Sequence, residues 1–376
     1  MRLVLAVLRY LPALGGSTRV VQLLAEGVAA RGHEVTVVTQ EEPGSPTREV
    51  IGGVQVERVG MRHVGGFRIP RGYLHRLRTL DADVFHLHGN RIWCVDYYLP
   101  FARSFSWPQV ITPHGFYHYW MRRGFVRWLY YERYFPGRLR AFDRYIALTE
   151  GELEQVAGWK FPREQIQRIP NGVDLSEFRE LHPDADATRT SLGISNRRMA
   201  VYVGGLYDNK RVDRIVRAVA RTHGAWGLAV IGHDIPGTPY DQRHCEALAR
   251  ELGANVRFLG PRPRTEVLRA LASADAYLQG SAFEGFGVSL LEAMAAGLPF
   301  IAFDAGASRE LAATGAGYLV CSEAEMADRL NDVVDHREDL RRSALAAIPS
   351  YSAERMVDRH LEIYRELTIK PPAPAP

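Results

Sequence analysis

The chain has 376 residues, of which 46% are hydrophobic and 24% charged, and its formal net charge is +4. This length fits two globular domains better than one, and the composition argues against a mainly disordered or fibrous protein. So small a net charge gives no reason to expect a nucleic-acid partner.

The cysteines and the apolar runs predict a protein of a reducing, cytoplasmic compartment. Cys94, Cys245 and Cys321 are scattered without the C-x-x-C spacing of a zinc site, so free thiols are expected. No run reaches the roughly 18 apolar residues of a membrane-spanning helix. The N-terminal sequence MRLVLAVLRYLP has too short an apolar run for a signal peptide, and no small-residue cleavage site follows it.

The first half of the chain alternates strands with helices. Residues 3–8 form a continuous apolar strand, and residues 18–31 have apolar side chains at helical spacing, with Gly32 at the end. Further strands are predicted at residues 34–39, 55–59, 84–87, 109–112 and 145–148. This β-α-β order predicts a parallel sheet with helices on both faces.

A second β-α-β series follows a turn and a polar stretch. The sequence IPNGVD, from Ile169 to Asp174, indicates the turn, and the residues after it to about 195 suit a linker. Strands are then predicted at residues 199–203, 228–231, 256–259, 276–278 and 300–303, and helices at 212–222, 241–252 and 288–296.

The two series predict an α/β fold of two Rossmann-like, doubly wound domains facing a central cleft. We expect them at residues 1–180 and 195–350, with a C-terminal helix over 351–370 packing back on the first domain and a disordered PPAPAP tail. Ligands bind beyond the carboxyl ends of the strands in such sheets, and clefts between domains favour ligand sites. Residues that follow strands are therefore the functional candidates.

Gly15 and Gly16 follow the first strand and precede a helix, so backbone there could approach a phosphate group closely. A dinucleotide-binding turn is the alternative. It requires G-x-G-x-x-G, whereas this loop is GGSTRV, although Glu41 after the second strand could serve as its ribose acid.

Three histidines follow or occupy strands of the first domain. His114, in ITPHGF, lies at a strand end before a glycine, which favours a role in the site over a structural one. His86 and His88, in FHLHG, share one face of a strand. A metal pair is conceivable, but packing is preferred because no third ligand is indicated.

The segment 116–144 interleaves arginines with aromatic residues. A basic, aromatic amphipathic helix suits an anionic membrane surface, and it could also stack on sugar rings or bind an acidic partner. A helix packed on the first domain with its arginines in water is equally consistent. The arginines are Arg122, Arg123, Arg127, Arg133, Arg138, Arg140 and Arg144.

Lys210 follows the first strand of the second domain and is one of only three lysines, the others being Lys160 and Lys370. A lysine at a strand end can neutralise a diphosphate as a compact charge. Arg211 follows it directly and could add a second positive charge.

The sequence EGFGVSLLEAMAAGLP, from Glu284 to Pro299, reads as a glycine-rich loop that opens a helix. Backbone N–H groups around Phe286, Gly287 and Val288, at the positive end of the helix, suit the diphosphate of a bound nucleotide. Glu292, one turn into the helix, could accept hydrogen bonds from a ribose diol, and Glu284 could accept them from sugar hydroxyls. A helix cap with two solvated glutamates is the structural alternative.

These motifs, in this order, resemble those of the retaining glycosyltransferases of the GT-B fold, family 4 or group 1, which include mannosyltransferases and sucrose synthase. The resemblance implies that Glu284 contacts the transferred sugar, Glu292 the ribose and His114 the donor sugar. It also implies that the first domain serves the acceptor and the second the nucleotide sugar. The matching motifs are Gly15-Gly16, His114-Gly115, Pro170 to Asp174, Gly204 to Lys210 and Glu284 to Glu292.

The chain departs from the family pattern beside Lys210. The resemblance implies an arginine where this chain has Gly205, and a glycine where it has Arg211. Loss of one of two phosphate-binding cations would weaken stabilisation of the leaving group.

The resemblance implies a hexosyltransferase that moves a sugar from a UDP- or GDP-sugar to an acceptor hydroxyl with retention, in polysaccharide or glycolipid synthesis. No metal cofactor is expected, because the helix N-terminus and Lys210 can carry the diphosphate charge. A carbohydrate or lipid-linked acceptor is expected, with peripheral contact to the inner membrane face through 116–144 as an open option. The alternatives are a sugar phosphorylase, a nucleotide-sugar-modifying enzyme and a non-catalytic nucleotide-sugar-binding protein.

Overall fold

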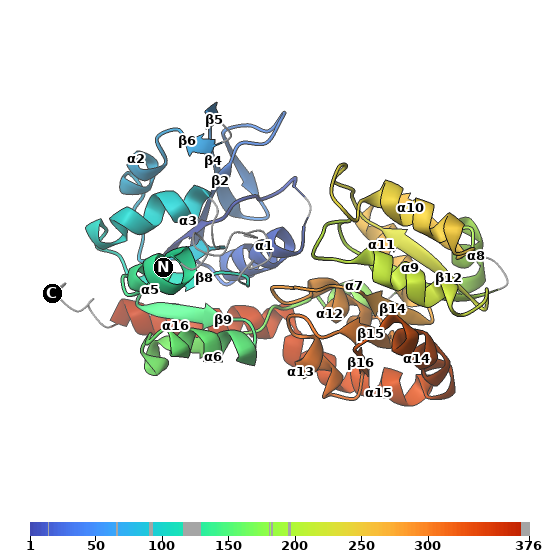
Figure 1. Ribbon diagram of the computed structural model, residues 1–376. Helices are drawn as coiled ribbons and strands as arrows, with labels where there is room; N and C mark the ends of the chain where they lie inside the picture. The colour runs from blue at the N-terminus through green and yellow to red at the C-terminus, as the bar shows by residue number, and fades with distance from the viewer. Residues whose placement is uncertain are drawn as a thin grey trace. The chain divides into compact units, whose positions relative to one another are not determined.

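A computed structural model of the chain describes residues 1–13, 15–64, 67–89, 93–115, 129–179, 181, 183–194 and 197–369. The chain forms two compact units (Figure 1). The first comprises Met1–Gly172 and Ala353–Pro376, and the second comprises Val173–Ser352.

Among the described residues of the first unit, eight strands form one sheet in the order β10-β9-β8-β7-β1-β2-β4-β3. β3 pairs antiparallel with β4, and the other neighbouring pairs are parallel. The strands are β1 (Arg2–Ala6), β2 (Glu34–Gln40), β3 (Arg48–Ile51), β4 (Val54–Val59), β7 (Val84–His88), β8 (Gln109–Thr112), β9 (Arg144–Ala147) and β10 (Ile166–Arg168). β5 (Met61–Val64) and β6 (Phe67–Pro70) form a separate antiparallel hairpin.

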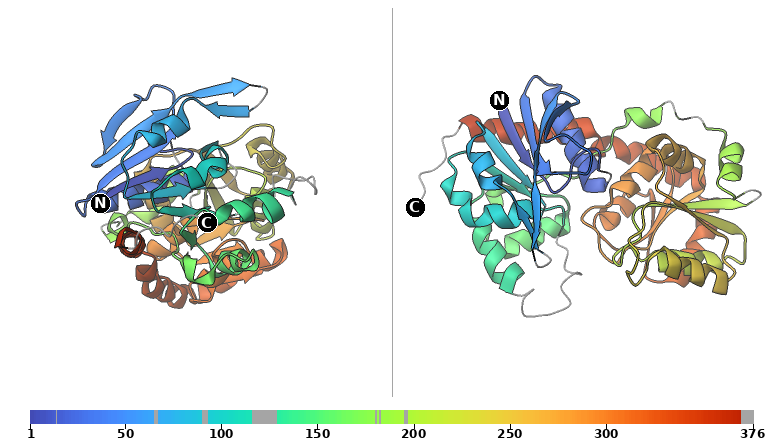
Figure 2. Two further views of the ribbon diagram at one scale, coloured as in Figure 1. Left: turned by 90° about the vertical axis from the view of Figure 1, so that its left-hand side faces the viewer. Right: turned by 90° about the horizontal axis from the view of Figure 1, so that it is seen from above.

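The helices of the first unit lie on both faces of this sheet (Figure 2). Those in the described residues are α1 (Gly16–Ala29), α2 (Tyr73–Arg78), α3 (Trp93–Tyr98), η1 (Leu99–Ser104), η3 (Leu129–Tyr134), α5 (Phe135–Leu139), α6 (Glu150–Gly158), η4 (Arg163–Gln165) and α16 (Ala353–Ile369).

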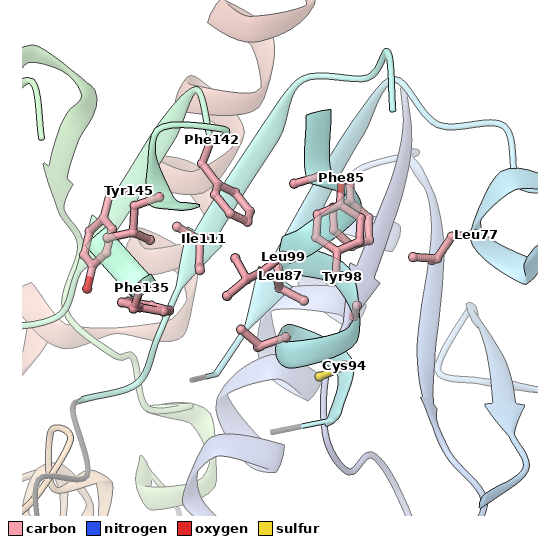
Figure 3. Close-up of a cluster of buried hydrophobic side chains, with 14 of the residues drawn as sticks. Leu77, Phe85, Leu87, Cys94, Tyr98, Leu99, Ile111, Phe135, Phe142 and Tyr145 are labelled. Atoms are coloured by element: carbon pink, nitrogen blue, oxygen red, sulfur yellow. The ribbon is translucent and has the colours of Figure 1, made fainter. Parts of the chain in front are cut away.

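A cluster of buried apolar side chains joins the sheet to α3 and α5 (Figure 3). Phe85 on β7 packs against Tyr98 of α3, with ring centroids 4.6 Å apart, and against Trp107 at 5.4 Å. Burial of several fully enclosed aromatic and aliphatic side chains is the main source of stability for such a layer. Leu87, Ile111 and Tyr145 continue the cluster across β7, β8 and β9.

The last helix, α16, packs on the first unit although the second unit precedes it in the chain (red in Figure 1). It lies against α1 at Gly27, where a Cβ atom would come within 2.6 Å of Val357. The glycine therefore permits the close approach of the two helices. Tyr364 of α16 forms a 2.6 Å hydrogen bond with His86 on β7.

The described residues of the second unit hold a six-stranded parallel sheet in the order β13-β12-β11-β14-β15-β16. This is the strand order of a doubly wound Rossmann sheet, in which the direction of winding reverses between β11 and β14. The strands are β11 (Arg198–Val203), β12 (Trp226–Ile231), β13 (Val256–Gly260), β14 (Ala276–Gln279), β15 (Phe300–Phe303) and β16 (Gly317–Val320).

Helices cover both faces of the second sheet as well (Figure 2). They are α7 (Ser176–Arg179), α8 (Ala185–Ser191), α9 (Val212–Ala220), α10 (Gln242–Glu251), α11 (Arg264–Ser273), α12 (Val288–Ala295), α13 (Ser308–Ala312), α14 (Glu323–Asp335), α15 (Arg337–Ala347) and η5 (Ile348–Tyr351).

The polar stretch before residue 195 is more ordered than the irregular linker expected from the sequence. It contains α7 and α8 and belongs to the second unit. Asp184 caps α8 by accepting a 3.0 Å hydrogen bond from the Ala187 N–H, and Arg189 donates to the Ser273 carbonyl at 2.9 Å. These polar side chains are therefore structural: Asp184 caps α8, and Arg189 connects α8 to the backbone at Ser273.

The two predicted Rossmann-like sheets are confirmed, and each strand expected from the sequence is present within a few residues. The short strands β3, β5, β6, β10 and β16 were not anticipated. No helix in the described ranges is long and apolar enough to cross a bilayer.

Glu152 on α6 is a buried carboxyl whose protonation is coupled to folding. It accepts hydrogen bonds from the Tyr145 hydroxyl and the Leu148 N–H, each at 2.9 Å. Burial nevertheless raises the pKa of Glu152 from 4.5 to about 7, because it penalises the charged form. The folded chain therefore keeps this proton at a pH where the unfolded chain has released it.

We expect Glu152 to reduce stability progressively as the pH rises from about 4.5 to 7, by up to about 3 kcal/mol. The Glu152→Gln variant keeps an acceptor for Leu148 but cannot ionise, so its stability should lack this loss. Urea denaturation of both proteins at pH 5 and pH 7.5 measures the difference. Parallel pH dependences in the two proteins would contradict the expectation.

Candidate active site

In the second unit, the candidate residues gather at the reversal of strand order. β11 and β14 are neighbours, and the chain winds outward from them in opposite directions. The loop after β11 contains Lys210, and the loop after β14 contains Glu284. Loops that follow the carboxyl ends of strands at such a reversal diverge, which exposes the sheet edge to a ligand.

The structure joins Lys210 to Glu284 directly. The Lys210 Nζ lies 2.6 Å and 2.7 Å from the two carboxylate oxygens of Glu284, and the Ser281 hydroxyl donates to Oε1 at 2.7 Å. The side chains of Lys210 and Glu284 are 21% and 10% exposed. A lysine and a carboxylate thus share a largely enclosed position at the sheet edge.

Two further residues hold these loops together. Asn209 donates its side-chain amide to the Phe283 carbonyl at 3.1 Å, and its own carbonyl accepts from the Ala282 N–H at 2.8 Å. On the other side, Gly306 has a φ of 61°, and a Cβ there would lie 2.7 Å from the Cβ of Glu284. A side chain at residue 306 would therefore displace the Glu284 loop.

Arg211, expected to add a positive charge beside Lys210, is also paired with a carboxylate in the structure. Its guanidinium forms two hydrogen bonds with Asp213, at 2.8 Å and 2.9 Å, and lies 4.5 Å from the ring centre of Tyr240. The Asp213 carboxylate therefore neutralises Arg211. Arg211 also precedes α9 as its N-cap residue, with a φ of 47°.

Residue 205, where the resemblance implies an arginine, is a glycine that lies beside the ring of Tyr207. A Cβ at Gly205 would come within 2.4 Å of the Tyr207 ring. The Tyr207 hydroxyl in turn bonds to the His233 ring, on the loop after β12. The Tyr207 ring fills the space that a longer side chain at residue 205 would need.

Helix α12 begins directly after this loop. Gly287 precedes it with a φ of 102°, a conformation that favours glycine, and Val288 is its first residue. Phe286 is buried, and its carbonyl accepts from the Ala307 N–H at 2.9 Å. The glycine brings the first turn of α12 to the same sheet edge as Lys210.

Glu292, one turn into α12, is held by Arg264 of α11. The Arg264 Nη1 lies 2.6 Å from Glu292 Oε1, while its Nη2 lies 2.7 Å from Glu177. The Glu292 side chain is 9% exposed. One arginine thus orients the carboxylate expected to receive a ribose, and it contacts Glu177 at the same time.

The first unit has a corresponding reversal between β1 and β7. Gly15 and Gly16 are exposed at the start of α1, after β1. His114 follows β8 with a φ of 59°, and its Nε2 lies 3.0 Å from His88 Nδ1. Glu41, the ribose acid of the dinucleotide alternative, instead accepts from the Met61 N–H at 2.7 Å.

The basic, aromatic segment 116–144 is described only in part, because 116–128 lie outside the described residues. In the remainder, Phe135 and Leu139 are buried while Arg133, Arg138 and Arg140 are exposed. Arg138 lies 5.4 Å from the ring centre of Tyr134. Phe135 thus faces the core, and these three arginines face solvent.

No cluster of three or more candidate metal ligands occurs within the described ranges. Two Asp-x-Asp sequences, Asp81 to Asp83 and Asp184 to Asp186, are present in the chain, and this pattern can bind a metal–diphosphate pair. Asp83 of the first bonds to Arg2 at 2.8 Å, and Asp184 of the second caps α8. Both sequences have structural partners.

Two family models match the chain, one to each half. The model described as "Glycosyltransferase Family 4" matches residues 14–177, and that described as "Glycosyl transferases group 1" matches residues 184–348. The chain belongs to the family 4 glycosyltransferases. The predicted family and enzyme class are thereby confirmed, and the dinucleotide-binding alternative is excluded.

Two named relatives match this glycosyltransferase over nearly its whole length. It is 28% identical to the GDP-mannose-dependent alpha-mannosyltransferase of Mycobacterium tuberculosis (strain CDC 1551 / Oshkosh), over 90% of this chain and 88% of the relative. It is 27% identical to the GDP-mannose:cellobiosyl-diphosphopolyprenol alpha-mannosyltransferase of Xanthomonas oryzae pv. oryzae (strain PXO99A), over 97% of each.

A solved structure shares the fold of this glycosyltransferase. Sucrose-phosphate synthase from Thermosynechococcus elongatus matches it with a TM-score of 0.80 and 22% identity, over 98% of this chain and 99% of that one. The likeness confirms the predicted GT-B fold.

The Lys210–Glu284 pair should be energetically coupled. A double-mutant cycle with Lys210→Met and Glu284→Gln should give a coupling of about 1–3 kcal/mol in the free energy of unfolding, because each single change leaves a largely buried charge unpaired. Urea denaturation of the four proteins measures it. The exposed Arg342–Asp339 pair, 3.2 Å apart on α15, is the control and should show little coupling. Equal coupling in the two pairs would contradict this expectation.

Proposed function

We propose that this enzyme transfers a hexose from a nucleoside diphosphate sugar to an acceptor hydroxyl, with retention of anomeric configuration. The observation that supports this most strongly is the Lys210–Glu284 pair at the reversal between β11 and β14. A cation, a carboxylate and the start of a helix then converge on one sheet edge. Such groups can bind the phosphates of a diphosphate and the hydroxyl groups of a sugar.

Lys210 acts on the leaving diphosphate. In the structure its charge is balanced by Glu284, and a diphosphate, carrying more negative charge, would compete for the ammonium group. Glu284 would then accept hydrogen bonds from hydroxyl groups of the sugar. The pair thus keeps both side chains in position before the donor arrives, which lowers the cost of ordering them on binding.

The start of α12 and Glu292 bind the rest of the nucleotide. Backbone N–H groups of Gly287 and Val288 suit phosphate oxygens, since the helix N-terminus carries a partial positive charge. Glu292 accepts from the ribose hydroxyls. Arg264 holds the carboxylate in place through one of its oxygens.

Chemistry then follows from positioning and charge. The bond between the anomeric carbon and the phosphate oxygen breaks, and the bond to the acceptor oxygen forms on the same face. The acceptor proton passes to an oxygen of the leaving phosphate. Lys210 stabilises the charge that develops there, so no protein nucleophile and no metal ion is required.

GDP-mannose is the first donor to test, because both relatives described above are named for it. The same comparison favours a lipid-linked saccharide as acceptor, in polysaccharide or glycolipid synthesis, since one relative is named for a diphosphopolyprenol acceptor. UDP-hexoses form the second group of donors.

Lys210→Ala and Glu284→Gln should each lower the turnover number for sugar transfer by about 100-fold or more, because each removes stabilisation present in the transition state. The assay measures release of nucleoside diphosphate with and without acceptor, in the presence of EDTA. Release that requires acceptor distinguishes a transferase from a nucleotide-sugar hydrolase or modifying enzyme.

Arg342→Ala, on the exposed face of α15, is the matched control and should transfer at the wild-type rate. Wild-type turnover in Lys210→Ala would contradict the role of the lysine. Complete loss of wild-type activity in EDTA, restored by a divalent ion, would contradict the metal-free chemistry. Donor binding without any turnover would favour the non-catalytic alternative.

We also propose that the enzyme meets a lipid-linked acceptor at an anionic membrane surface through 116–144. Each basic residue near such a surface contributes about 1 kcal/mol. Co-sedimentation with anionic vesicles should therefore fall by roughly tenfold or more when three exposed arginines are changed to serine together, and it should weaken with salt. The three are Arg133, Arg138 and Arg140.

The control replaces three exposed arginines of the second unit and should sediment like the wild type. These are Arg250, Arg341 and Arg342. Equal binding by all three proteins, or none by the wild type at low salt, would rule out this surface.

A further inference from the structure

Four histidines form a buried cluster at the carboxyl end of β7 and β8 in the first unit. His86 and His88 lie on β7, with ring centroids 4.0 Å apart, and His114 follows β8, 5.2 Å from His88. His360 of α16 lies 5.7 Å from His86. Since His86, His88 and His360 are at most 4% exposed, this is an enclosed group of imidazoles rather than a solvated patch.

The imidazoles are neutral. Burial lowers the pKa of His88 well below its ordinary value and lowers that of His114 to about 4, with the neighbouring histidines adding to the effect. A neutral imidazole has one N–H donor and one acceptor nitrogen. Two neutral rings that share a hydrogen bond therefore have a defined donor and a defined acceptor.

The contact between His88 and His114 fixes this direction. His88 Nδ1 lies 3.0 Å from His114 Nε2. The other nitrogen of His88, Nε2, is buried and has no hydrogen-bond partner among the described residues. A buried N–H without an acceptor is costlier and rarer than a buried acceptor without a donor. The proton of His88 therefore belongs on Nδ1.

We propose that His88 is a positioning residue that donates its Nδ1–H to His114 Nε2 and so holds His114 in the Nδ1–H tautomer. The half-buried His114 then presents a hydrogen-bond donor to an oxygen atom of the sugar substrate. This rests on the proposed function for the identity of the ligand. The assignment of the tautomer itself depends only on the cluster.

The C-terminal helix α16 holds His86, the neighbour of His88, in a fixed orientation. His86 bonds to the Thr112 hydroxyl through Nε2 at 2.8 Å and to the Tyr364 hydroxyl of α16 through Nδ1 at 2.6 Å. Both nitrogens of His86 are thus engaged, which fixes its ring plane. The His88 ring lies against that plane and cannot turn without disturbing it. α16 therefore contributes to the geometry of His114 indirectly, through His86 and His88.

Two substitutions separate hydrogen bonding from packing. His88→Phe keeps an aromatic ring against His86 but removes the donor. His88→Asn has an amide N–H close to the original Nδ1 and should restore the bond. We expect kcat/KM for the donor sugar to fall by about tenfold or more in His88→Phe and to recover in large part in His88→Asn.

A double variant, His88→Phe with His114→Phe, shows whether the two residues act together. It should be no less active than His114→Phe alone, because His88 acts only through His114. Additive losses would overturn the proposal. A thermal melt of each variant identifies any that has lost its fold.

The deciding experiment is nitrogen NMR of the full chain labelled with ¹⁵N-histidine, near pH 7. The chemical shifts of the two ring nitrogens distinguish the protonated from the unprotonated one, and His114→Phe identifies the signals of His114. We expect wild-type His114 to be protonated on Nδ1 alone, and His88→Phe to show a mixture of tautomers.

A wild-type His114 protonated on Nε2 would overturn the proposal, as would an unchanged His114 spectrum in His88→Phe. Since this measurement needs no substrate, it is independent of the proposed function. An enzyme with the expected tautomer but no sugar transfer would contradict the function and leave the positioning role of His88 supported.

Discussion

The ion pair between Lys210 and Glu284 is the constraint on which the geometry of the second unit's site depends. The two residues are 74 positions apart and belong to loops that leave neighbouring strands at the reversal of the sheet. Their charges balance each other in an enclosed position, so neither loop can move away without exposing an unpaired charge. Asn209 reinforces the same link through backbone contacts. The sheet supplies the position, and the ion pair orients the groups.

In the first unit, hydrogen bonds between neutral side chains orient the candidate residues, where the second unit uses an ion pair. Its residues at the reversal between β1 and β7 are two exposed glycines and a set of neutral histidines. The hydrogen bond between His88 and His114 fixes which ring nitrogen is the donor, while burial keeps the rings in their neutral form. Tyr364 of α16, near the C-terminus, forms a hydrogen bond with His86 of this cluster. The crossing of the C-terminal helix to the first unit thus has a consequence for the geometry of His114 as well as for packing.

The sequence predicts the fold well because most strands are apolar runs bounded by turns, and it makes Lys210, Glu284 and His114 candidates for the site because they follow strands in recognisable motifs. The partners of these residues could not be predicted. Arg264 meets Glu292 across 28 positions, and nothing in the local pattern of α11 indicates this contact. The sequence places Arg211 where it could add a positive charge, but it does not indicate that Arg211 pairs with Asp213. Pairing is a property of tertiary structure, whereas periodicity is local.

We infer that the loops after β11 and β14, together with α12, bind a nucleoside diphosphate. Isothermal titration of the full chain with GDP and with UDP tests it most directly, using Glu292→Ala to remove the ribose acceptor and Glu338→Ala, exposed on α15, as the control. We expect one of the two nucleotides to bind with 1:1 stoichiometry, Glu292→Ala to weaken it by about tenfold or more, and the control to bind as the wild type does. Unchanged affinity in Glu292→Ala, or no binding of either nucleotide to the wild type, would contradict the account.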